Sequence, residues 1–185
     1  MMVKRCDWAR EEPSISYHDN EWGYPEHNDQ KLFEFLILEG AQAGLSWITI
    51  LKRRQGYAKA FSNFDPKKIS RYNQKQINKL LNDQSIIRNR LKINSAINNA
   101  RQFLKVQQEF GTFDKYIWKF VDFKPIKNEF KKASDLPAST MISDKMSRDL
   151  KKRGFNFVGP TICYAFMQAT GMVNDHITEC FRYVK

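Results

Sequence analysis

Apolar residues recur along this chain at intervals of three and four, the spacing of one buried face of an α-helix. The longest such segment runs from about Asn89 to Phe110, and Gly111 follows it as a helix terminator. The residues with this spacing are Leu91, Ile93, Ile97, Ala100, Phe103, Leu104 and Gln107. No segment alternates with the period of two that a half-buried strand needs. The pattern therefore predicts an all-α fold, with residues 1–185 forming a single domain.

Capping residues, prolines and glycines divide the rest of the chain. The first thirty residues, rich in aromatic side chains and punctuated by prolines, indicate irregular structure over a core. The further predicted helices are a helix from Asn28 or Asp29 to Leu38, one within Leu45 to Phe61, Lys67 to Tyr72 after the Asp65-Pro66 cap, one after Asn73, Phe113 to Val121, Asp144 to Arg153 capped by Ser143, and Pro160 to Thr170 closed by Gly171. Phe123 to Pro137 is expected to be a surface loop.

A single carboxylate, Glu39, interrupts the apolar and small-residue stretch LILEGAQAGLSW from Leu36 to Trp47. Periodicity alone slightly favours placing Glu39 on the wet side of a helix. Its apolar neighbours leave little polar face, and Gly40 and Gly44 are close-approach or bend positions, which instead indicates a helix end beside a cavity. A carboxylate beside Trp47 in such a place suits a flat, cationic ligand.

The net charge of +11 makes a polyanion the first expected partner, although many small proteins are basic. No stretch has the length of a transmembrane helix, and the first ten residues lack the apolar region of a signal peptide. We therefore expect no membrane partner and a cytoplasmic protein. The chain has three cysteines, which cannot form a closed disulfide framework and agree with a reducing compartment.

Metal-competent residues fall at opposite ends of the chain. Cys6 and His18 lie near the start, and His176 and Cys180 lie near the end, four residues apart. Two thiolates and two imidazoles make a closed tetrahedral set for zinc. The spacing from Cys6 to His18 is no zinc-finger signature. Spacing alone therefore favours the interpretation that these residues are a small buried cysteine and a surface histidine. The set nevertheless uses two of the three cysteines and two of the three histidines.

The stretch from Leu150 to Ala169, LKKRGFNFVGPTICYAFMQA, indicates a helix, a tight turn and a second helix. Glycines at the corners, Gly154 and Gly159, allow backbone amides to point outward at the start of the second helix, where an anion is favoured. Such a turn can hold a DNA phosphate, with Lys151, Lys152 and Arg153 adding attraction. An ordinary helical corner with a solvated basic face explains the segment about equally well.

Long ordered strings resemble the 3-methyladenine DNA glycosylase I family, among the helix-hairpin-helix glycosylases. The strings are YHDNEWG at 17–23, LEGAQAGLSWITILKRR at 38–54, KKRGFNFVGPTICYAFMQATG at 151–171 and NDH at 174–176. The resemblance covers nearly the whole chain. It implies a helix-hairpin-helix DNA-binding motif at 150–170 and a DNA repair enzyme acting on alkylated double-stranded DNA. The enzyme would flip out N3-methyladenine and hydrolyse its N-glycosidic bond, leaving an abasic site and free 3-methyladenine.

The resemblance also assigns residues. The implied base pocket consists of Tyr17, Trp22, Glu39, Trp47 and Trp8, with Glu39 as the catalytic residue. The implied DNA contacts are Ala43, Gly44 and Leu45, a small apolar wedge, and the hairpin residues Phe155, Asn156, Phe157, Val158 and Gly159. The implied zinc ligands are Cys6, His18, His176 and Cys180, holding one structural ion per chain. We expect a monomer.

Most helix-hairpin-helix glycosylases carry a catalytic aspartate after the motif. The resemblance aligns that position with Asn174, so Asp175 is not expected to replace it. The chemistry tolerates the loss, because adenine methylated at N3 is cationic and departs neutral, so little acid catalysis is needed. The site must instead select the flipped base, with Glu39 favouring its charge and the aromatic rings stacking on it.

Other functions remain open from the residues alone. A non-enzymatic DNA-binding protein would keep the hairpin and the basic surface but has no reason to hold Glu39 among aromatic rings. A glycosylase with another base preference or a lyase activity would need a pocket lysine, and none of the candidate pocket residues is lysine. A zinc hydrolase is disfavoured, because four protein ligands leave no open position for water.

Overall fold

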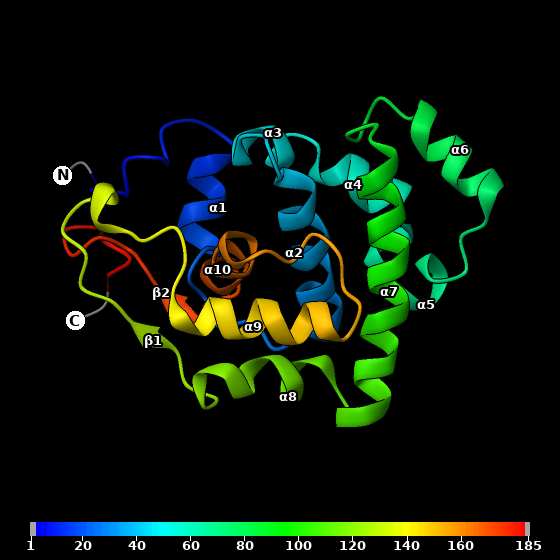
Figure 1. The fold of residues 1–185 in the computed structure, drawn as a ribbon. Coiled ribbons are helices and arrows are strands. Elements are labelled where there is room, and N and C mark those ends of the chain that lie inside the picture. Colours follow the sequence, from blue (N-terminus) through cyan, green and yellow to red (C-terminus); the bar gives the residue numbers. More distant parts are fainter. Residues whose placement is uncertain (1–2, 184–185) are drawn as a thin grey trace.

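The computed structural model describes residues 3–183, so residues 1–2 and 184–185 of the predicted domain lie outside it. The predicted all-α class is confirmed (Figure 1). The helices are α1 (Ser14–Asn20), α2 (Asp29–Gln42), α3 (Trp47–Leu51), α4 (Arg54–Ala60), α5 (Pro66–Ile69), α6 (Gln74–Asn82), α7 (Arg90–Phe110), α8 (Phe113–Trp118), α9 (Met141–Lys152) and α10 (Pro160–Ala169). Short 3₁₀ turns lie between these helices, at η1 (Ser62–Phe64), η2 (Lys119–Val121) and η3 (Ala133–Asp135).

Helix α2 is the centre of the molecule. It packs against α10 on one side and α7 on the other, and it also contacts α3 and α8. Its residues from Leu32 to Ala41 are all buried, so it has almost no face toward solvent. Helix α9 packs on α10, and α7 carries α5 and α6 on its outer side (Figure 1). Glu39 therefore lies in the most enclosed helix of the fold, and the predicted stretch continues beyond the end of α2 to Trp47.

Several helix boundaries follow from capping chemistry that the sequence predicted. The Asn28 side chain accepts hydrogen bonds from the first free amides of α2, and Asp65 does the same before Pro66 in α5. Asn73 forms a capping box at the start of α6. Helix α7 begins after Asn89 and ends at Gly111, whose φ of +84° suits glycine.

Other boundaries differ from the prediction. The first thirty residues include α1, whose buried residues Ser14, Tyr17 and His18 are spaced by three and four. The prolines were interpreted there as breaks, but Pro13 directly precedes the helix and its carbonyl accepts the amide hydrogen of Tyr17. The region from Leu45 to Phe61 is divided between α3 and α4.

Helix α9 begins three residues earlier than predicted. Thr140 is its N-cap, and Ser143 closes the capping box from inside the first turn. The predicted Ser143 cap was therefore wrong in position, because a capping box contains two residues able to accept an amide hydrogen and the sequence does not distinguish them.

Two short strands interrupt the helical pattern. β1 (Ile126–Lys127), within the predicted loop Phe123 to Pro137, pairs in parallel with β2 (Val173–Asn174). Two-residue strands are too short to show the alternation on which strand prediction depends. They tie the loop to the segment that leads into His176. Among residues 3–183, none of the helices has the length and apolar character needed to cross a bilayer.

Candidate active site and metal centre

Glu39 lies in the wall of an open cavity of about 470 Å³ between α1, α2, α3 and α10. Its side chain is buried, with only 4% exposed, so the wet-face alternative for Glu39 is wrong. The predicted pocket residues Trp8, Tyr17, Trp22 and Trp47 line the same cavity. The structure thus brings together in one cavity residues that lie as far apart in the sequence as positions 8 and 47.

The aromatic rings of the cavity are in contact with one another. The Tyr17 ring centroid lies 5.4 Å from that of Trp47, and the Trp8 centroid lies 5.1 Å from that of Trp22 in an edge-to-face arrangement. The ring centroids of Tyr17 and Trp8 are 6.1 Å apart, so the four rings form a continuous row. Rings held in this way present both faces and edges to a flat ligand.

Two buried polar groups of the cavity, the Glu39 carboxyl and the Trp47 indole nitrogen, have no hydrogen-bond partner within residues 3–183. Burial alone raises the pKa of Glu39 to about 8, and no hydrogen bond or cation in residues 3–183 offsets it. Burial, and to a smaller extent the nearby charge of Glu39, raise the pKa of Tyr17 well above its usual value. The indole Nε1 of Trp47 is a buried donor without a hydrogen-bond partner in the described chain. Buried polar groups usually have partners, so these atoms are available for a ligand.

A partly buried ion cluster joins α2 and α4. The guanidinium of Arg54 donates to Glu34 at 2.6 Å and to Glu21 at 2.8 Å. The same group lies 5.4 Å from the centre of the Phe35 ring. Sequence reasoning missed this cluster, because its members come from three separate segments and no spacing rule connects them.

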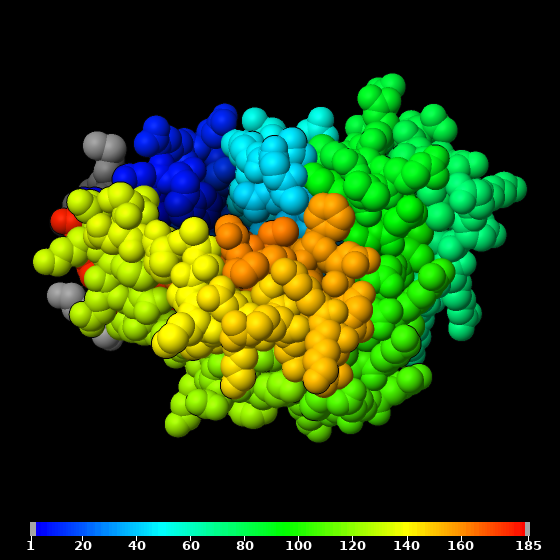
Figure 2. All heavy atoms as spheres, viewed as in Figure 1, coloured from blue at the N-terminus to red at the C-terminus, as the bar shows by residue number. Residues whose placement is uncertain are grey.

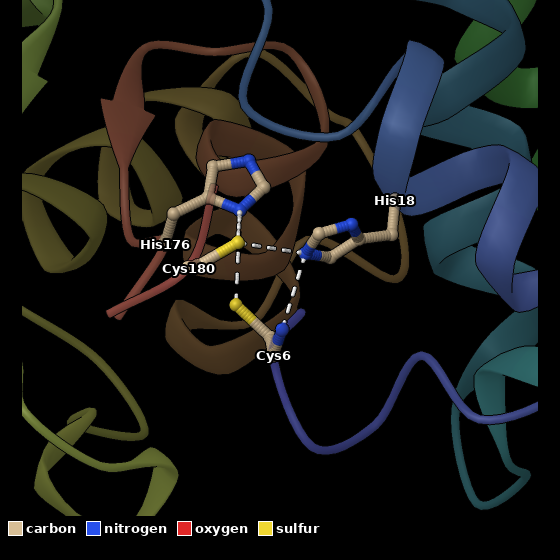
Figure 3. Close-up of side chains that lie close together, drawn as sticks. All are labelled: Cys6, His18, His176 and Cys180. Carbon is tan, nitrogen blue, oxygen red and sulfur yellow. Dashed lines mark hydrogen bonds between the residues drawn. The ribbon is translucent and has the colours of Figure 1, made fainter. Parts of the chain in front are cut away.

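The four predicted metal ligands meet beside α1, which carries His18 (Figure 3). All four are buried, and their donor atoms lie within 4.8 Å of one another. The Cys180 sulfur is 3.4 Å from Nε2 of His18 and 3.5 Å from Nδ1 of His176, and the Cys6 sulfur is 3.7 Å from that Nδ1. Donor atoms at the corners of a zinc tetrahedron lie about 3.4–3.8 Å apart, so the set fits such an ion.

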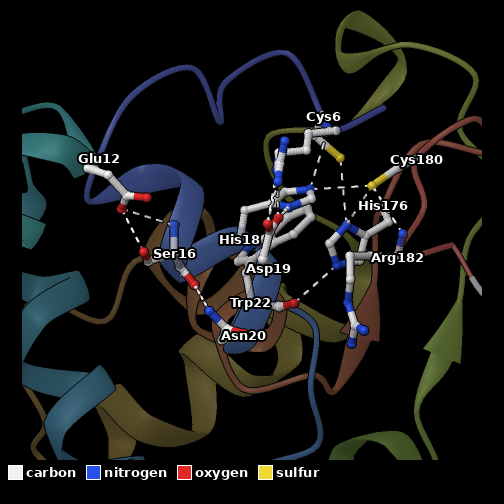
Figure 4. Close-up of polar contacts among 11 residues, drawn as sticks. Cys6, Glu12, Ser16, His18, Asp19, Asn20, Trp22, His176, Cys180 and Arg182 are labelled. Carbon is white, nitrogen blue, oxygen red and sulfur yellow. Dashed lines mark hydrogen bonds and ion pairs between the residues drawn. The ribbon is translucent and has the colours of Figure 1, made fainter. Parts of the chain in front are cut away.

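The second nitrogen of each histidine is held by the protein (Figure 4). Nδ1 of His18 lies 2.7 Å from the Asp19 carboxylate, and Nε2 of His176 lies 3.1 Å from the carbonyl oxygen of Trp22. These contacts leave Nε2 of His18 and Nδ1 of His176 facing the two sulfurs. Carboxylate and carbonyl partners of this kind orient metal-bound imidazoles.

The surroundings of the sulfurs also suit a cation. Without one, burial raises the pKa of Cys6 to about 12 and keeps it a thiol. The backbone amide of Arg182 lies 3.4 Å from the Cys180 sulfur and can donate to a thiolate. The cluster can therefore hold a metal ion, and the alternative of a surface histidine at position 18 is wrong, since that side chain is fully buried.

The hairpin segment, residues 153–159, joins α9 to α10. Phe155 and Val158 are buried anchors, whereas Asn156 is exposed and Phe157 has a φ of +53°. The backbone amides of Phe157, Val158 and Gly159 make no hydrogen bond within residues 3–183. Arg153, predicted to add attraction, is committed elsewhere, because it pairs with Glu109 and Asp149.

The turn after α2, residues 43–45, reaches the same face of the molecule as the hairpin segment (Figure 2). Gly44 has a φ of +76°, which glycine adopts without strain, and Leu45 is 38% exposed beside it. Within α2, a Cβ on Gly40 would lie 3.4 Å from Cβ of Phe157, so the hairpin segment rests against this helix.

Asp175 and Asn174 have structural contacts. The Asp175 carboxylate, 1% exposed, accepts hydrogen bonds from Tyr164, Gln168 and Asn128 at 2.6–2.7 Å. Oδ1 of Asn174 accepts the amide hydrogen of His176. Neither side chain lines the cavity.

Some cavity residues were not singled out from the sequence. They are Arg10, Glu11, Ser14, Gln42, Ile48, Leu136, Ala165 and Gln168. Gln42 follows Glu39 by three residues and Ser14 precedes Tyr17 by three, so helical spacing from the predicted residues was the signal that could have found these two. Leu136 and Gln168 carry no such signal, because only the tertiary fold brings them to the cavity.

The fold and this site define a helical protein with a cavity whose aromatic rings and buried carboxyl group could hold a flat ligand. Residues 8–183 match the sequence model of the methyladenine glycosylase family. DNA-3-methyladenine glycosylase 1 of Escherichia coli K12 is 48% identical, with the alignment covering 98% of this chain and 97% of that protein. The Haemophilus influenzae DNA-3-methyladenine glycosylase is 46% identical over 97% of both.

Solved structures agree. A crystal structure of 3-methyladenine DNA glycosylase I has a TM-score of 0.95 and 49% identity, covering 98% of this chain and all of that one. The Staphylococcus aureus enzyme, whose structure concerns 3-methyladenine recognition, has a TM-score of 0.94 and 35% identity, covering 98% of this chain and 97% of that one. The chain belongs to the methyladenine glycosylase family.

Proposed function

We propose that this protein is a monofunctional DNA-3-methyladenine glycosylase that hydrolyses the N-glycosidic bond of N3-methyladenine in alkylated double-stranded DNA. The observation that carries the proposal is Glu39, an unpaired buried carboxyl group in the wall of an aromatic cavity. Membership of the family and the activities named for its relatives support the same function.

In the proposed site, a flipped base stacks against the aromatic rings. The Trp47 and Tyr17 rings, whose centroids are 5.4 Å apart, offer a face and an edge to the base. Cation–π contact with such rings is worth roughly 0.5–2 kcal/mol. The carboxyl of Glu39 accepts hydrogen bonds from the edge of the base. Because a cation nearby favours the ionised carboxyl, binding of the methylated base releases the proton that burial holds on Glu39 at neutral pH.

Little further catalysis is then required. Water attacks the sugar carbon C1′ as its bond to N9 of the base breaks, and the bonding electron pair moves to the ring and neutralises its positive charge. The water proton passes to solvent, leaving a hydroxyl on C1′ and a neutral 3-methyladenine. Glu39 stabilises the charge on the base while it remains attached, and the engaged Asp175 takes no part in this step.

The DNA would lie across the face that carries the hairpin segment and the turn at residues 43–45 (Figure 2). In this helix-hairpin-helix arrangement, free amides of the hairpin segment hold a phosphate, which positions the duplex without reading sequence. Leu45 enters the stack where the base leaves it. The net charge of +11 adds long-range attraction to the duplex.

We further infer that the metal is zinc, one per chain. Two cysteines and two histidines are its preferred donors; here their donor atoms lie within 4.8 Å of one another, and three sulfur–nitrogen pairs lie 3.4–3.7 Å apart. With four protein ligands the ion cross-links the two ends of the chain and offers no position for a reacting water. Its contribution is structural.

Incubation with methylated duplex DNA tests the proposed function. We expect the purified protein to release 3-methyladenine, measured by chromatography of the freed bases, and to leave abasic sites without cutting the strand. Strand cleavage would point to a lyase, but no lysine of the described chain lines the cavity. Binding of DNA with no released base would instead support the non-enzymatic DNA-binding alternative.

A further inference from the structure

A lysine from α7 holds the C-terminal end of α2. Nζ of Lys92 donates to the carbonyl oxygens of Ala41 at 2.8 Å and Ala43 at 2.7 Å. The last carbonyls of a helix lack internal partners and carry partial negative charge, so an ammonium group there is well placed. Lys92 thereby fixes the direction in which the chain leaves α2, immediately before Gly44 and Leu45.

Asparagines from the same helix hold the hairpin segment. Oδ1 of Asn99 accepts the amide hydrogen of Asn156 at 2.8 Å, and Nδ2 of Asn99 donates to the carbonyl of Asn156 at 2.9 Å. Asn98 donates to the carbonyl of Gly154 at 2.7 Å and to the Asn156 side chain at 2.9 Å. The Asn99 side chain is almost fully buried and has both its polar ends paired.

Lys92 and Asn99 are separated by two helical turns, which is about 10 Å along the axis, and so both lie on one face of α7. Between them Ile93, Ala96 and Ile97 are buried in the core, which fixes this stretch of the helix. In Figure 2 the residues of α7 (green) border both the α2–α3 region (cyan) and the hairpin segment (orange). One rigid helix thus contacts both proposed DNA-binding segments.

We propose that Lys92 and Asn99 are positioning residues that set the distance between the turn at residues 43–45 and the hairpin segment. The proposal rests on the DNA-binding roles given to these two segments under the proposed function. The phosphate held by the hairpin segment and the base step opened by Leu45 belong to one duplex. A misplacement of one segment relative to the other by about 1 Å would weaken their joint engagement.

The Lys92→Met variant tests the first contact, because methionine keeps an apolar stem of similar length and removes the donors. We expect its affinity for an abasic-site duplex to fall by roughly tenfold, the scale of losing charge-assisted hydrogen bonds that order a turn. Its affinity for free 3-methyladenine should stay within about twofold of the wild type, since the cavity residues are unchanged. Lys92→Arg, which can donate to both carbonyls, should restore DNA affinity.

Lys105→Met is the matched control. Lys105 is exposed on the same helix, so the substitution makes the same change in charge without touching either segment. We expect it to bind DNA like the wild type. For the second contact, Asn98→Ala and Asn99→Ala should each lower abasic-duplex affinity with free-base affinity retained, and Asn98→Ala is the safer variant for folding because its side chain is less buried.

Two results would overturn the proposal. Lys92→Met could bind abasic DNA as tightly as the wild type, or it could lose affinity for DNA and for the free base in parallel, as expected of a general packing residue. Failure of the proposed function looks different, because the wild-type protein itself would then release no 3-methyladenine.

Discussion

The backbone carbonyl of Trp22 accepts a hydrogen bond from Nε2 of His176 at 3.1 Å, and the Trp22 indole lines the cavity beside Glu39. One residue is thus shared by the metal cluster and the candidate base pocket. His18 and Tyr17 repeat the relationship along α1, since one faces the cluster and its neighbour faces the cavity. Order in the cluster is therefore expected to support the shape of the pocket.

Purified protein is expected to contain one zinc ion per chain, and Cys180→Ser should lose it. We expect the free energy of unfolding to fall by ~3 kcal/mol or more, because loss of a bound metal removes binding energy that stabilises only the folded state. Metal analysis and denaturant unfolding measure the two effects.

Cys163→Ser is the control for that substitution. Cys163 is equally buried but lies outside the cluster, with its sulfur 3.5 Å from the carbonyl of Val158. This variant should keep its zinc. Wild-type protein that contains no stoichiometric metal after purification without chelator would contradict the assignment.

Glu39→Gln should lower both excision of 3-methyladenine and affinity for the free base, with a loss on the order of 1–3 kcal/mol from a charge-assisted hydrogen bond. Binding to an abasic-site duplex, which presents no base, should hardly change. Excision assays and equilibrium binding provide the comparison. A large stability loss with excision intact would mean that Glu39 is only a structural residue.

The same substitution should alter the pH dependence of stability. Burial raises the pKa of Glu39 to about 8, so between its unfolded value and pH 8 the folded state binds a proton that the unfolded state has lost. Stability from this group is therefore fullest at low pH and declines as pH rises, by at most about 1.4 kcal/mol per pH unit. Urea unfolding at pH 5 and pH 8 should show that the free energy of unfolding of Glu39→Gln, relative to that of the wild type, is higher at pH 8 than at pH 5. An equal difference at both pH values would refute the raised pKa.

Leu45→Ala should reduce excision from duplex DNA by about tenfold and affect single-stranded substrate much less, since only the duplex has a stack to open. The side chain is 38% exposed, so thermal stability should remain close to that of the wild type. Single-turnover rates on both substrates give the comparison. An equal loss on both would assign Leu45 to the pocket rather than to a wedge.

Gly159→Ala tests the phosphate contact. Gly159 has a φ of −64° and a Cβ there would meet no atom within 4 Å, so the fold accepts alanine. Added bulk at the hairpin should weaken binding to methylated and unmethylated duplexes alike, by roughly tenfold, because backbone contacts carry no base information. Fluorescence anisotropy with both duplexes measures this. A loss confined to methylated DNA would be inconsistent with a phosphate clamp.

Local chemistry predicted much of the fold. Caps such as Asn28, Asp65 and Asn73 act through the next few amides, so sequence is sufficient to place them. The seven-residue helix α1 was missed, since a helix this short is stabilised by the core it covers rather than by its own propensity. The strand pair β1–β2 depends entirely on tertiary contact.

Some residues of the candidate site could likewise be predicted from local sequence, and others could not. Glu39 was found from its own neighbours, whereas joining Cys6 and His18 to His176 and Cys180 needed resemblance to a family, because no spacing rule spans the chain. Neither the contact of Lys92 with the end of α2 nor the ion cluster at Arg54 could be predicted, because each joins groups from separate segments of the chain. The single domain, the monomeric state and the cytoplasmic location stay predictions.

The contact of Cys6 with the C-terminal segment brings the two ends of the described chain side by side, and the amide of Phe181 donates to the carbonyl of Lys4 at 2.9 Å. Such proximity makes the protein a candidate for circular permutation. A short Gly/Ser linker could join the ends near the cluster, and new ends could be opened at the exposed residues Lys131 to Lys132. In that rearranged chain, Cys6 and Cys180 would become near neighbours in sequence, and the metal would close a small loop instead of one spanning nearly the whole polypeptide.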